Sequence, residues 1–234
     1  MPLTRKTSLF TEGATVIASL VKLPACIGSG QFVLAPAATA AVLDNTGGAT
    51  VTLSANNLQI WENSLTFQGS SSLNMGSGSV LFQTNVTATV SNNTLTVGAI
   101  IDDGVMRNLT KAGPGTLTVN GGISFFTDGS VTVNGGVLAL TGSSLSGCPV
   151  ITVASNATLD VSAAGGLMLT TTLNGTPETL EGSGAVTGNV ADDGSSATTI
   201  NPGGGTPGTL TINGNLTLNG GSTIDFKLSP SADC

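Results

Sequence analysis

The sequence predicts an all-β fold, a right-handed parallel β-helix (a β-solenoid) that forms a single elongated domain. Three observations favour this fold: charged residues make up only 8% of the chain, glycine accounts for 33 of its 234 residues, and a short strand pattern recurs. Ordinary globular domains contain about 25% charged residues. Good helix formers such as Glu, Lys, Arg and Gln are therefore scarce, whereas β-branched residues beside Gly and Asn are abundant.

The recurrent pattern alternates Thr with Leu, Val or Ile and ends in Asn-Gly or Gly-Gly. Clear copies lie at 115–122, 129–136, 208–214 and 215–221, and looser copies at 49–54, 93–98 and 157–162. Each copy predicts a strand of period two, with a corner where Gly or Asn supplies the positive φ. An array of hairpins is the alternative, but such short strands lack the aromatic cross-strand pairs that hold hairpins together. Coils of roughly 20–25 residues, about eight to ten in number, explain the pattern better.

Three regions follow from this pattern. Residues 1–30 form a leader or cap with a weak likeness to a signal peptide, residues 31–228 form the solenoid, and residues 229–234 form a tail. Glu12, Gly13 and Lys22 interrupt the apolar part of the leader, which favours a cap over a cleaved signal. No stretch of 18 apolar residues occurs, so no membrane span is expected.

Charge and composition exclude several classes of function. The net charge of −7 without a basic patch argues against nucleic acid as a partner. The absence of His removes Ser-His-Asp and Cys-His catalysis and makes a zinc site hard to build. Cys26, Cys148 and Cys234 are interpreted as three isolated thiols. A Cys26–Cys148 disulfide and an intermolecular bond through Cys234 stay open as alternatives.

One segment resembles a known repeat. Residues 109–120, Leu-Thr-Lys-Ala-Gly-Pro-Gly-Thr-Leu-Thr-Val-Asn, are similar to the LTKxGxGTLTL signature of autotransporter-associated β-strand repeats. Further matching segments lie at 131–140, 180–190, 200–203 and 206–212, and together they cover about half of the chain. Residues 121–129 replace the link that usually joins the two halves of the repeat. The resemblance implies a secreted or surface protein of Gram-negative-type bacteria whose repeats carry no catalytic residues.

Acidic residues are the candidates for chemistry, because parallel β-helices also include polysaccharide-cleaving enzymes. They are Asp102–Asp103, Asp192–Asp193, Glu178 with Glu181, and Asp160. Glycoside hydrolysis needs two carboxylates that face each other, whereas adjacent residues of a strand point to opposite faces. Both doublets precede Gly, which is typical of turns, and Arg107 is interpreted as a surface partner of the first doublet. No catalytic, cofactor-binding or metal residue is therefore predicted, with weak Ca²⁺ binding at the Asp-Asp-Gly corners as an alternative.

Aromatic residues are predicted to be structural. Trp61 is placed in the core or an end cap rather than on the surface as a ligand platform. The phenylalanines predicted as members of the core stack or caps are Phe32, Phe67, Phe82, Phe125, Phe126 and Phe226.

The expected function is a non-catalytic structural rod, extracellular or on a bacterial surface. The final strand, residues 222–228, has no obvious cap after it, which predicts self-association into a homo-oligomer or fibre through the solenoid ends. Surface glycans are further candidate partners. A glycan- or host-binding adhesin and a polysaccharide-cleaving enzyme remain the alternative functions.

Overall fold

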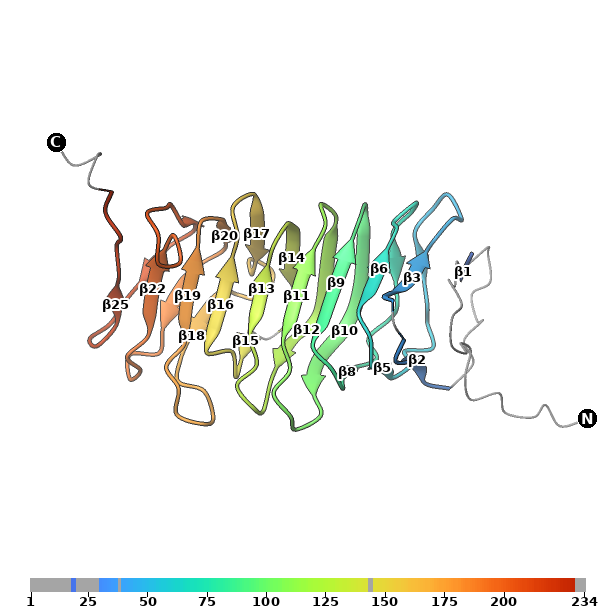
Figure 1. Ribbon diagram of the computed structural model, residues 1–234, viewed down its shortest axis with the longest axis horizontal. Coiled ribbons are helices and arrows are strands. Elements are labelled where there is room, and N and C mark those ends of the chain that lie inside the picture. The colour runs from blue at the N-terminus through green and yellow to red at the C-terminus, as the bar shows by residue number, and fades with distance from the viewer. Residues whose placement is uncertain (1–17, 20–29, 38, 143–144, 230–234) are drawn as a thin grey trace, which may run out of the picture.

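The computed structural model describes residues 18–19, 30–37, 39–142 and 145–229, which form a parallel β-solenoid of about eight turns (Figure 1). No described residue is helical, and all paired strands run parallel, so the predicted all-β parallel solenoid is confirmed. Coil length varies, because the coil that leads from Val131 to its partner Ile151 is clearly shorter than the coil that leads from Val150 to its partner Thr179. The predicted coil length is therefore correct for the regular coils only.

The first sheet stacks ten strands along the rod. In stacking order they are β1 (Ala18–Ser19), β3 (Ala41–Asp44), β6 (Leu65–Phe67), β9 (Val86–Val90), β11 (Leu109–Ala112), β13 (Val131–Val133), β16 (Val150–Val153), β19 (Thr179–Gly182), β22 (Thr199–Pro202) and β25 (Thr223–Ile224).

The other strands form a 12-stranded and a 3-stranded sheet. The larger sheet contains β2 (Phe32–Leu34), β4 (Val51–Thr52), β5 (Gln59–Trp61), β7 (Leu73–Asn74), β8 (Val80–Phe82), β10 (Thr94–Asp102), β12 (Thr116–Ser124), β14 (Gly136–Leu140), β15 (Leu145–Ser146), β17 (Ala157–Asp160), β20 (Ala185–Thr187) and β23 (Thr211–Asn213). The smaller sheet contains β18 (Leu167–Leu169), β21 (Val190–Asp192) and β24 (Leu216–Thr217).

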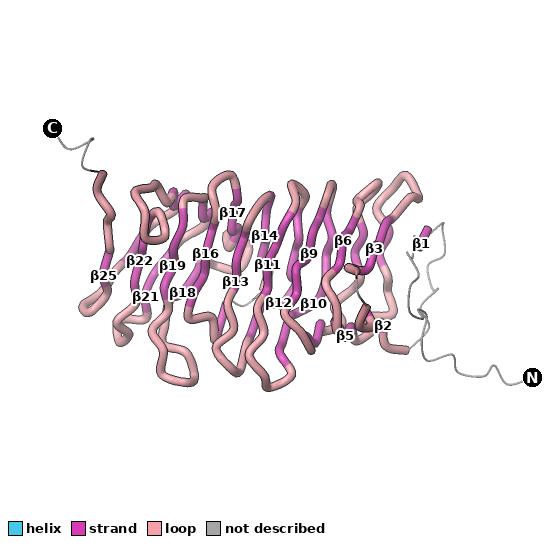
Figure 2. Tube along the Cα trace, in the orientation of Figure 1, coloured by secondary structure: helices cyan, strands magenta, loops and turns pink. Residues whose placement is uncertain are grey.

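Each coil has three straight segments, because the long strands β10 and β12 turn a corner. The first half of β10 pairs with β7 and its second half with β8, and the pairing with β12 shifts register between Gly98 and Ile100. The chain therefore passes from the first sheet to a second face, then to a third face, and returns through a loop to the first sheet (Figure 2). Strands β18, β21 and β24 occupy the third segment in the C-terminal coils, where that segment forms a sheet of its own.

The alternating sequence explains the core. Inward residues form ladders such as Leu109–Val131–Ile151–Leu180, in which all four side chains are fully buried. Threonines between them point outward and stay partly exposed. The predicted corners are equally specific: Gly136 has φ +61°, and a Cβ there would lie 2.3 Å from the backbone oxygen of Gly115 in the coil before. Only glycine permits this close approach of successive coils.

Aromatic residues stack near the third face. The rings of Trp61 and Phe82 lie 5.6 Å apart and those of Phe82 and Phe125 lie 6.3 Å apart. Trp61 is fully buried, which confirms its predicted place in the core and removes it as a surface platform. The core prediction is wrong for Phe126 and Phe226, which are 53% and 63% exposed. Phe126 lies in a loop just after its strand has ended, so the strand alternation no longer directs its side chain inward.

Gln59 is a polar residue in the aliphatic interior. It lies in register between Phe32 and Val80, is almost fully buried, and neither of its side-chain polar atoms finds a hydrogen-bond partner among the described residues. An unpaired buried amide costs about 1–3 kcal/mol.

We expect Gln59→Leu to stabilise the solenoid by about 1–2 kcal/mol, because leucine fills a similar volume without polar atoms that need partners. The measurement is the urea-unfolding midpoint. Gln83→Leu is the matched control, since Gln83 is exposed and its replacement should change stability by less than about 0.5 kcal/mol. A lower midpoint for Gln59→Leu would mean that the amide has a partner of its own.

Lys111 is a second polar residue that points inward, and its ammonium closes a corner. Its side chain is fully buried, and Nζ donates to the carbonyl oxygens of Ala112, Gly113 and Gly135 at 2.8–2.9 Å. Burial lowers the pKa of Lys111 to about 8. Because Gly135 belongs to the next coil, this single side chain ties two coils together.

We expect Lys111→Met to destabilise the protein by about 1–3 kcal/mol, because methionine retains much of the volume while three carbonyls lose their donor. Lys227→Met is the control, since Lys227 only pairs with Asp225 at the surface and such pairs contribute at most about 1 kcal/mol. Equal unfolding midpoints for the two variants would show that the corner carbonyls do not depend on Lys111.

Candidate functional site

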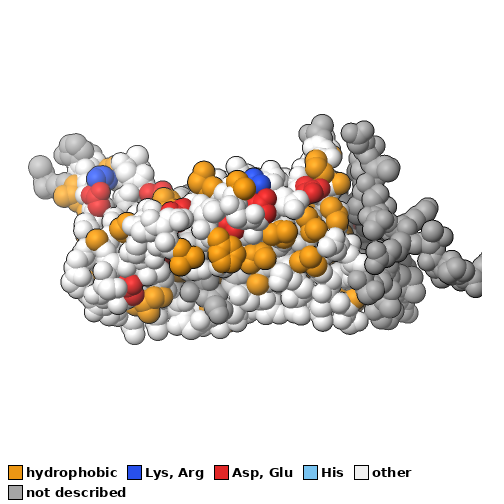
Figure 3. All heavy atoms as spheres, turned by 90° about the horizontal axis from the view of Figure 1, so that it is seen from below, with side chains coloured by type: hydrophobic (Ala, Val, Ile, Leu, Met, Phe, Trp, Pro, Cys, Tyr) orange, Lys and Arg blue, Asp and Glu red, His pale blue; other side chains and the backbone are white. Residues whose placement is uncertain are grey.

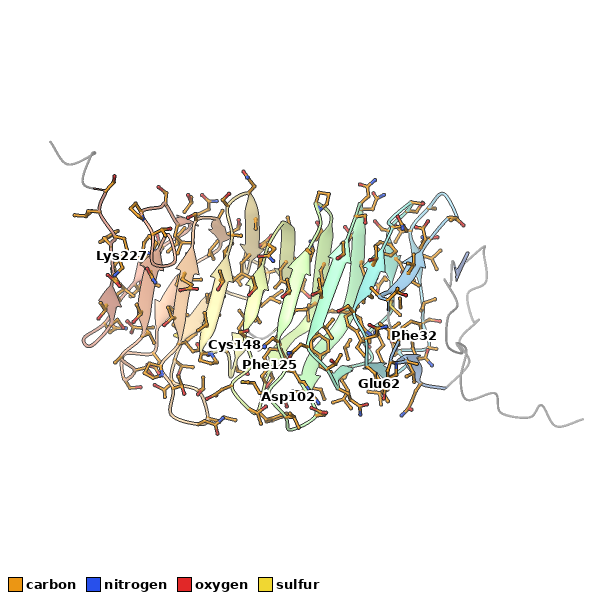
Figure 4. The ribbon with its side chains drawn as sticks, in the orientation of Figure 1. Phe32, Glu62, Asp102, Phe125, Cys148 and Lys227 are labelled. Carbon is orange, nitrogen blue, oxygen red and sulfur yellow. The ribbon has the colours of Figure 1, made fainter. Side chains whose placement is uncertain are left out.

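The return loops, which lead from the third face back to the first sheet, hold or directly follow most of the predicted acidic candidates. The relevant return loops are residues 103–108, 125–130, 147–149, 170–178 and 193–198. Figure 4 shows Asp102, Phe125 and Cys148, from successive coils, along this side of the solenoid.

The first aspartate of each doublet caps the following coil. Asp102 accepts hydrogen bonds from the backbone N–H groups of Gly104, Phe126 and Thr127, and from the Thr127 hydroxyl. Asp192 accepts bonds from Gly194, from the backbone and side-chain nitrogens of Asn219, and from the Ser222 hydroxyl. Both carboxylates are therefore engaged as acceptors within turns, which confirms the turn interpretation of the doublets.

The second aspartates cap their own loops. Asp103 accepts from the Val105 amide and forms a two-pronged pair with Arg107, with N–O distances of 2.8 and 2.9 Å. The Arg107 guanidinium holds the pKa of Asp103 below its usual range. Asp193 accepts from the amides of Ser195 and Ser196 and from the Thr170 hydroxyl. These bonds, led by the Ser195 amide, hold the pKa of Asp193 well below its usual range.

Glu178 and Glu181 do not form a pair. Glu178 is fully buried at the end of its return loop, whereas Glu181 points outward and accepts hydrogen bonds from Thr152 and Asn201. Asp160 lies elsewhere, and within the described part of the chain its carboxylate accepts bonds only from Ser162 in its own turn. The predicted acidic residues therefore do not come together in one site. Glu178 is the one that lies in a buried cluster, together with residues that were not among the candidates.

Glu178 lies in a buried acidic cluster that sequence reasoning missed. The cluster combines Glu178 with Cys148, which is fully buried, and with Asp128 in the return loop 125–130. Oε1 of Glu178 and Oδ1 of Asp128 are both buried and have no hydrogen-bond partner among the described residues. Spacing gives only part of the signal for this cluster: the step from Asp128 to Cys148 matches the predicted coil length, whereas the step from Cys148 to Glu178 is longer than any predicted coil.

Burial dominates the electrostatics of the cluster. It raises the pKa of Glu178 to about 7, an effect strengthened by Asp193 and Asp128 and offset in part by the backbone amides of Thr170 and Cys148. Burial also raises the pKa of the Cys148 thiol well above its usual value, with Glu178 and Asp128 adding to the shift. Near neutral pH the cluster therefore contains a protonated thiol and a carboxyl group close to its titration point.

Cys148 is a free thiol, so the alternative of a Cys26–Cys148 disulfide is not observed. Cys26 and Cys234 lie outside the described residues. Among the residues that the structure describes, no group of three or more His, Cys, Asp or Glu side chains is arranged to hold a metal ion. The described part of the chain also contains no helix that is long and apolar enough to cross a membrane.

Apolar side chains are exposed on the return loops. Val105, Met106, Phe126 and Leu173 are each more than half exposed. Figure 3, which views the solenoid from below, shows hydrophobic side chains gathered along the middle of this side. The return loops therefore carry exposed apolar groups on the same side of the solenoid as the buried acidic cluster.

Comparisons with family models, with curated proteins and with solved structures gave no match. The resemblance to autotransporter-associated repeats thus rests on the segments quoted above and stays a prediction.

We expect Asp192→Asn to lower the melting temperature at pH 7, because the amide cannot accept all four hydrogen bonds of the carboxylate. Hydrogen bonds from Ser222 and Asn219 lower the pKa of Asp192 to about 2. The folded-state pKa lies below that of the unfolded chain, so this stabilisation is complete above about pH 4 and is lost as the pH falls through 2.

The melting-temperature difference between wild type and Asp192→Asn should therefore shrink between pH 5 and pH 2. Asp160→Asn is the matched control, because the Asp160 carboxylate bonds only to Ser162. A difference that stays constant over this pH range would contradict the capping role of Asp192.

Proposed function

We propose that this chain is a non-catalytic structural β-solenoid of the autotransporter-passenger type, a stiff rod that acts outside the cell or on a bacterial surface. One observation carries the proposal: the carboxylates of both Asp-Asp doublets are engaged in turn hydrogen bonds along an unbroken parallel stack. Asp102, Asp192 and Asp193 thereby join coils to one another, whereas Asp103 bonds within its own loop. The burial of Trp61 also takes away the residue that a glycan-binding surface would have used.

The C-terminal coil supports assembly as part of this function. Ile200 is the last buried hydrophobic residue, and every described apolar side chain beyond it is at least partly exposed. Strands β23, β24 and β25 are the last of their faces among the described residues, and no described strand pairs with their outer backbone groups. Ile224, Phe226 and Leu228 are exposed at this end. An edge of this kind is a template for another strand.

A second copy of the chain is the proposed occupant of this end. The last described coil presents one terminal strand on each of its three faces. A coil that is itself three-sided and parallel can pair with all three strands, and this chain consists of such coils. Charge also favours a head-to-tail contact: residues 1–30 contain three of the six basic residues and one of the thirteen acids, whereas the remainder is strongly acidic. Contacts of this heterologous type produce open filaments when the rotation does not close.

We expect the purified chain to form filaments of uniform width in negative-stain electron microscopy, and their mean length should rise with protein concentration. Ile224→Lys places a charge on the open edge and should shorten or abolish the filaments. Val150→Lys is the control, because Val150 is 36% exposed on β16, a mid-rod strand that is paired on both sides, with β13 and β19. Single rods at all concentrations would refute assembly, and turnover of a polysaccharide panel would refute the non-catalytic function.

A further inference from the structure

The return loop 170–178 reaches across a whole coil. Elsewhere on this side, side chains bond to a neighbouring coil, as Thr127 does to Asp102 25 residues earlier. Thr176 Oγ1 instead donates to Asp128 Oδ2 at 3.1 Å, and Asn174 Nδ2 donates to the Phe126 carbonyl at 3.4 Å, each over 48 residues. The intervening coil has only the short return loop 147–149, so the longer loop passes over Cys148.

This loop, called the strap below, is a small antiparallel hairpin on a parallel solenoid. Thr171 and Pro177 form an antiparallel bridge, and the Thr172 amide donates to the Thr176 carbonyl at 2.8 Å. Its base is fixed to the following coil by the hydroxyls of Thr170 and Thr171, which bond to Asp193 and Ser196. Its tip is held by the two contacts to residues 126 and 128 described above. Leu173 at the tip is 80% exposed.

Glu178, when ionised, repels Asp128, the carboxylate that holds the tip of the strap through its hydrogen bond from Thr176. Glu178 ends the strap, is fully buried, and has an unpartnered Oε1. The ionisable groups that act on it are Asp128 in the loop 125–130, Asp193 in the loop 193–198 and the Cys148 thiol between them. None of these can neutralise a carboxylate. Asp128 also accepts the hydrogen bond from Thr176, so ionised Glu178 would face the same carboxylate that holds the tip.

We propose that residues 170–178 are a pH-sensitive strap that lies closed over Cys148 while Glu178 carries a proton and opens when Glu178 ionises. The strap has few tertiary contacts at its tip and a fixed base, as expected of a segment that opens locally at low cost. Opening returns the Glu178 carboxylate to water and exposes the thiol. This device is independent of the proposed scaffold function, since it requires neither assembly nor a particular cellular location.

The direction of the pH response follows from proton linkage. The pKa of Glu178 is about 7 in the closed state, and exposure to water returns it toward its ordinary value of 4.5. The closed state therefore binds the proton more tightly, and the opening equilibrium should rise with pH between these two values, by up to tenfold per pH unit, and level off above pH 7. The strap is closed at acidic pH and opens toward neutral pH.

The test measures the protection of Cys148 from a thiol reagent that reacts at acidic pH, an aromatic disulfide such as dithiodipyridine. Cys26→Ser and Cys234→Ser make Cys148 the only thiol in the chain. Dividing the labelling rate of the urea-unfolded chain by that of the folded chain at each pH removes the intrinsic reactivity of the thiol. We expect this protection factor to fall at least tenfold between pH 5 and pH 7 and then stay level.

Three variants make the test specific. Glu178→Gln should give a protection factor that does not depend on pH, whereas Glu181→Gln, a nearby change to an outward carboxylate, should retain the wild-type profile. Thr176→Val removes the hydrogen bond from Thr176 to Asp128 and should lower the protection factor at every pH without moving the pH midpoint of its change. Should Glu178→Gln fail to fold, Asp128→Asn tests the same repulsion and should shift the levelling-off to lower pH. A flat wild-type profile, or an unchanged profile in Glu178→Gln, would overturn the proposal.

Discussion

The in-register parallel pairing of each coil with the next is the constraint on which the rest of the structure depends. A residue such as Val131 must lie above Leu109 and below Ile151, so its side chain is directed inward or outward by its position in the stack. A one-residue slip would move every Leu and Val of the strand to the solvent face. Short strands are sufficient in this fold, because pairing with the strands on both sides fixes the register of each one.

This constraint decides where polar groups can lie. Straight segments leave little room for a buried polar group without a partner, and among the described residues the exceptions are the Gln59 amide and the Trp61 indole N–H, both in β5. The corners and strand ends must instead satisfy backbone groups that have left the ladder. Lys111 does this with an ammonium that binds carbonyls, and Asp102 and Asp192 do it with carboxylates that bind amides. Each of these side chains reaches the adjacent coil, so the few charged residues act mainly as connections between coils.

The straight segments could be predicted from the sequence, and the loops could not. Alternation indicated the first part of β12 (Thr116–Ser124) and the whole of β13 (Val131–Val133), because this signal is local. The same logic placed Trp61 inside correctly and Phe126 inside wrongly, since alternation has no meaning once a strand has ended. The turn function of Asp102 and Asp192 was also readable from the glycine that follows each doublet. The cluster of Glu178, Cys148 and Asp128 was not, because it depends on where three coils of unequal length bring their loops.

Unequal coil length is also what buries the Glu178 carboxyl group in this fold. The interior of each coil is fixed by its neighbours, but a loop outside the ladder can lengthen without disturbing any register. The coil that leads from Val131 to Ile151 returns through the short loop 147–149, while the longer coil that leads from Val150 to Thr179 returns through the loop 170–178. The short loop has too few residues to cover Cys148, and the longer one extends back over it. A carboxyl group is thereby buried under a loop rather than among the stacked strands, so that in the proposed strap its ionisation would open the loop and leave the stack intact.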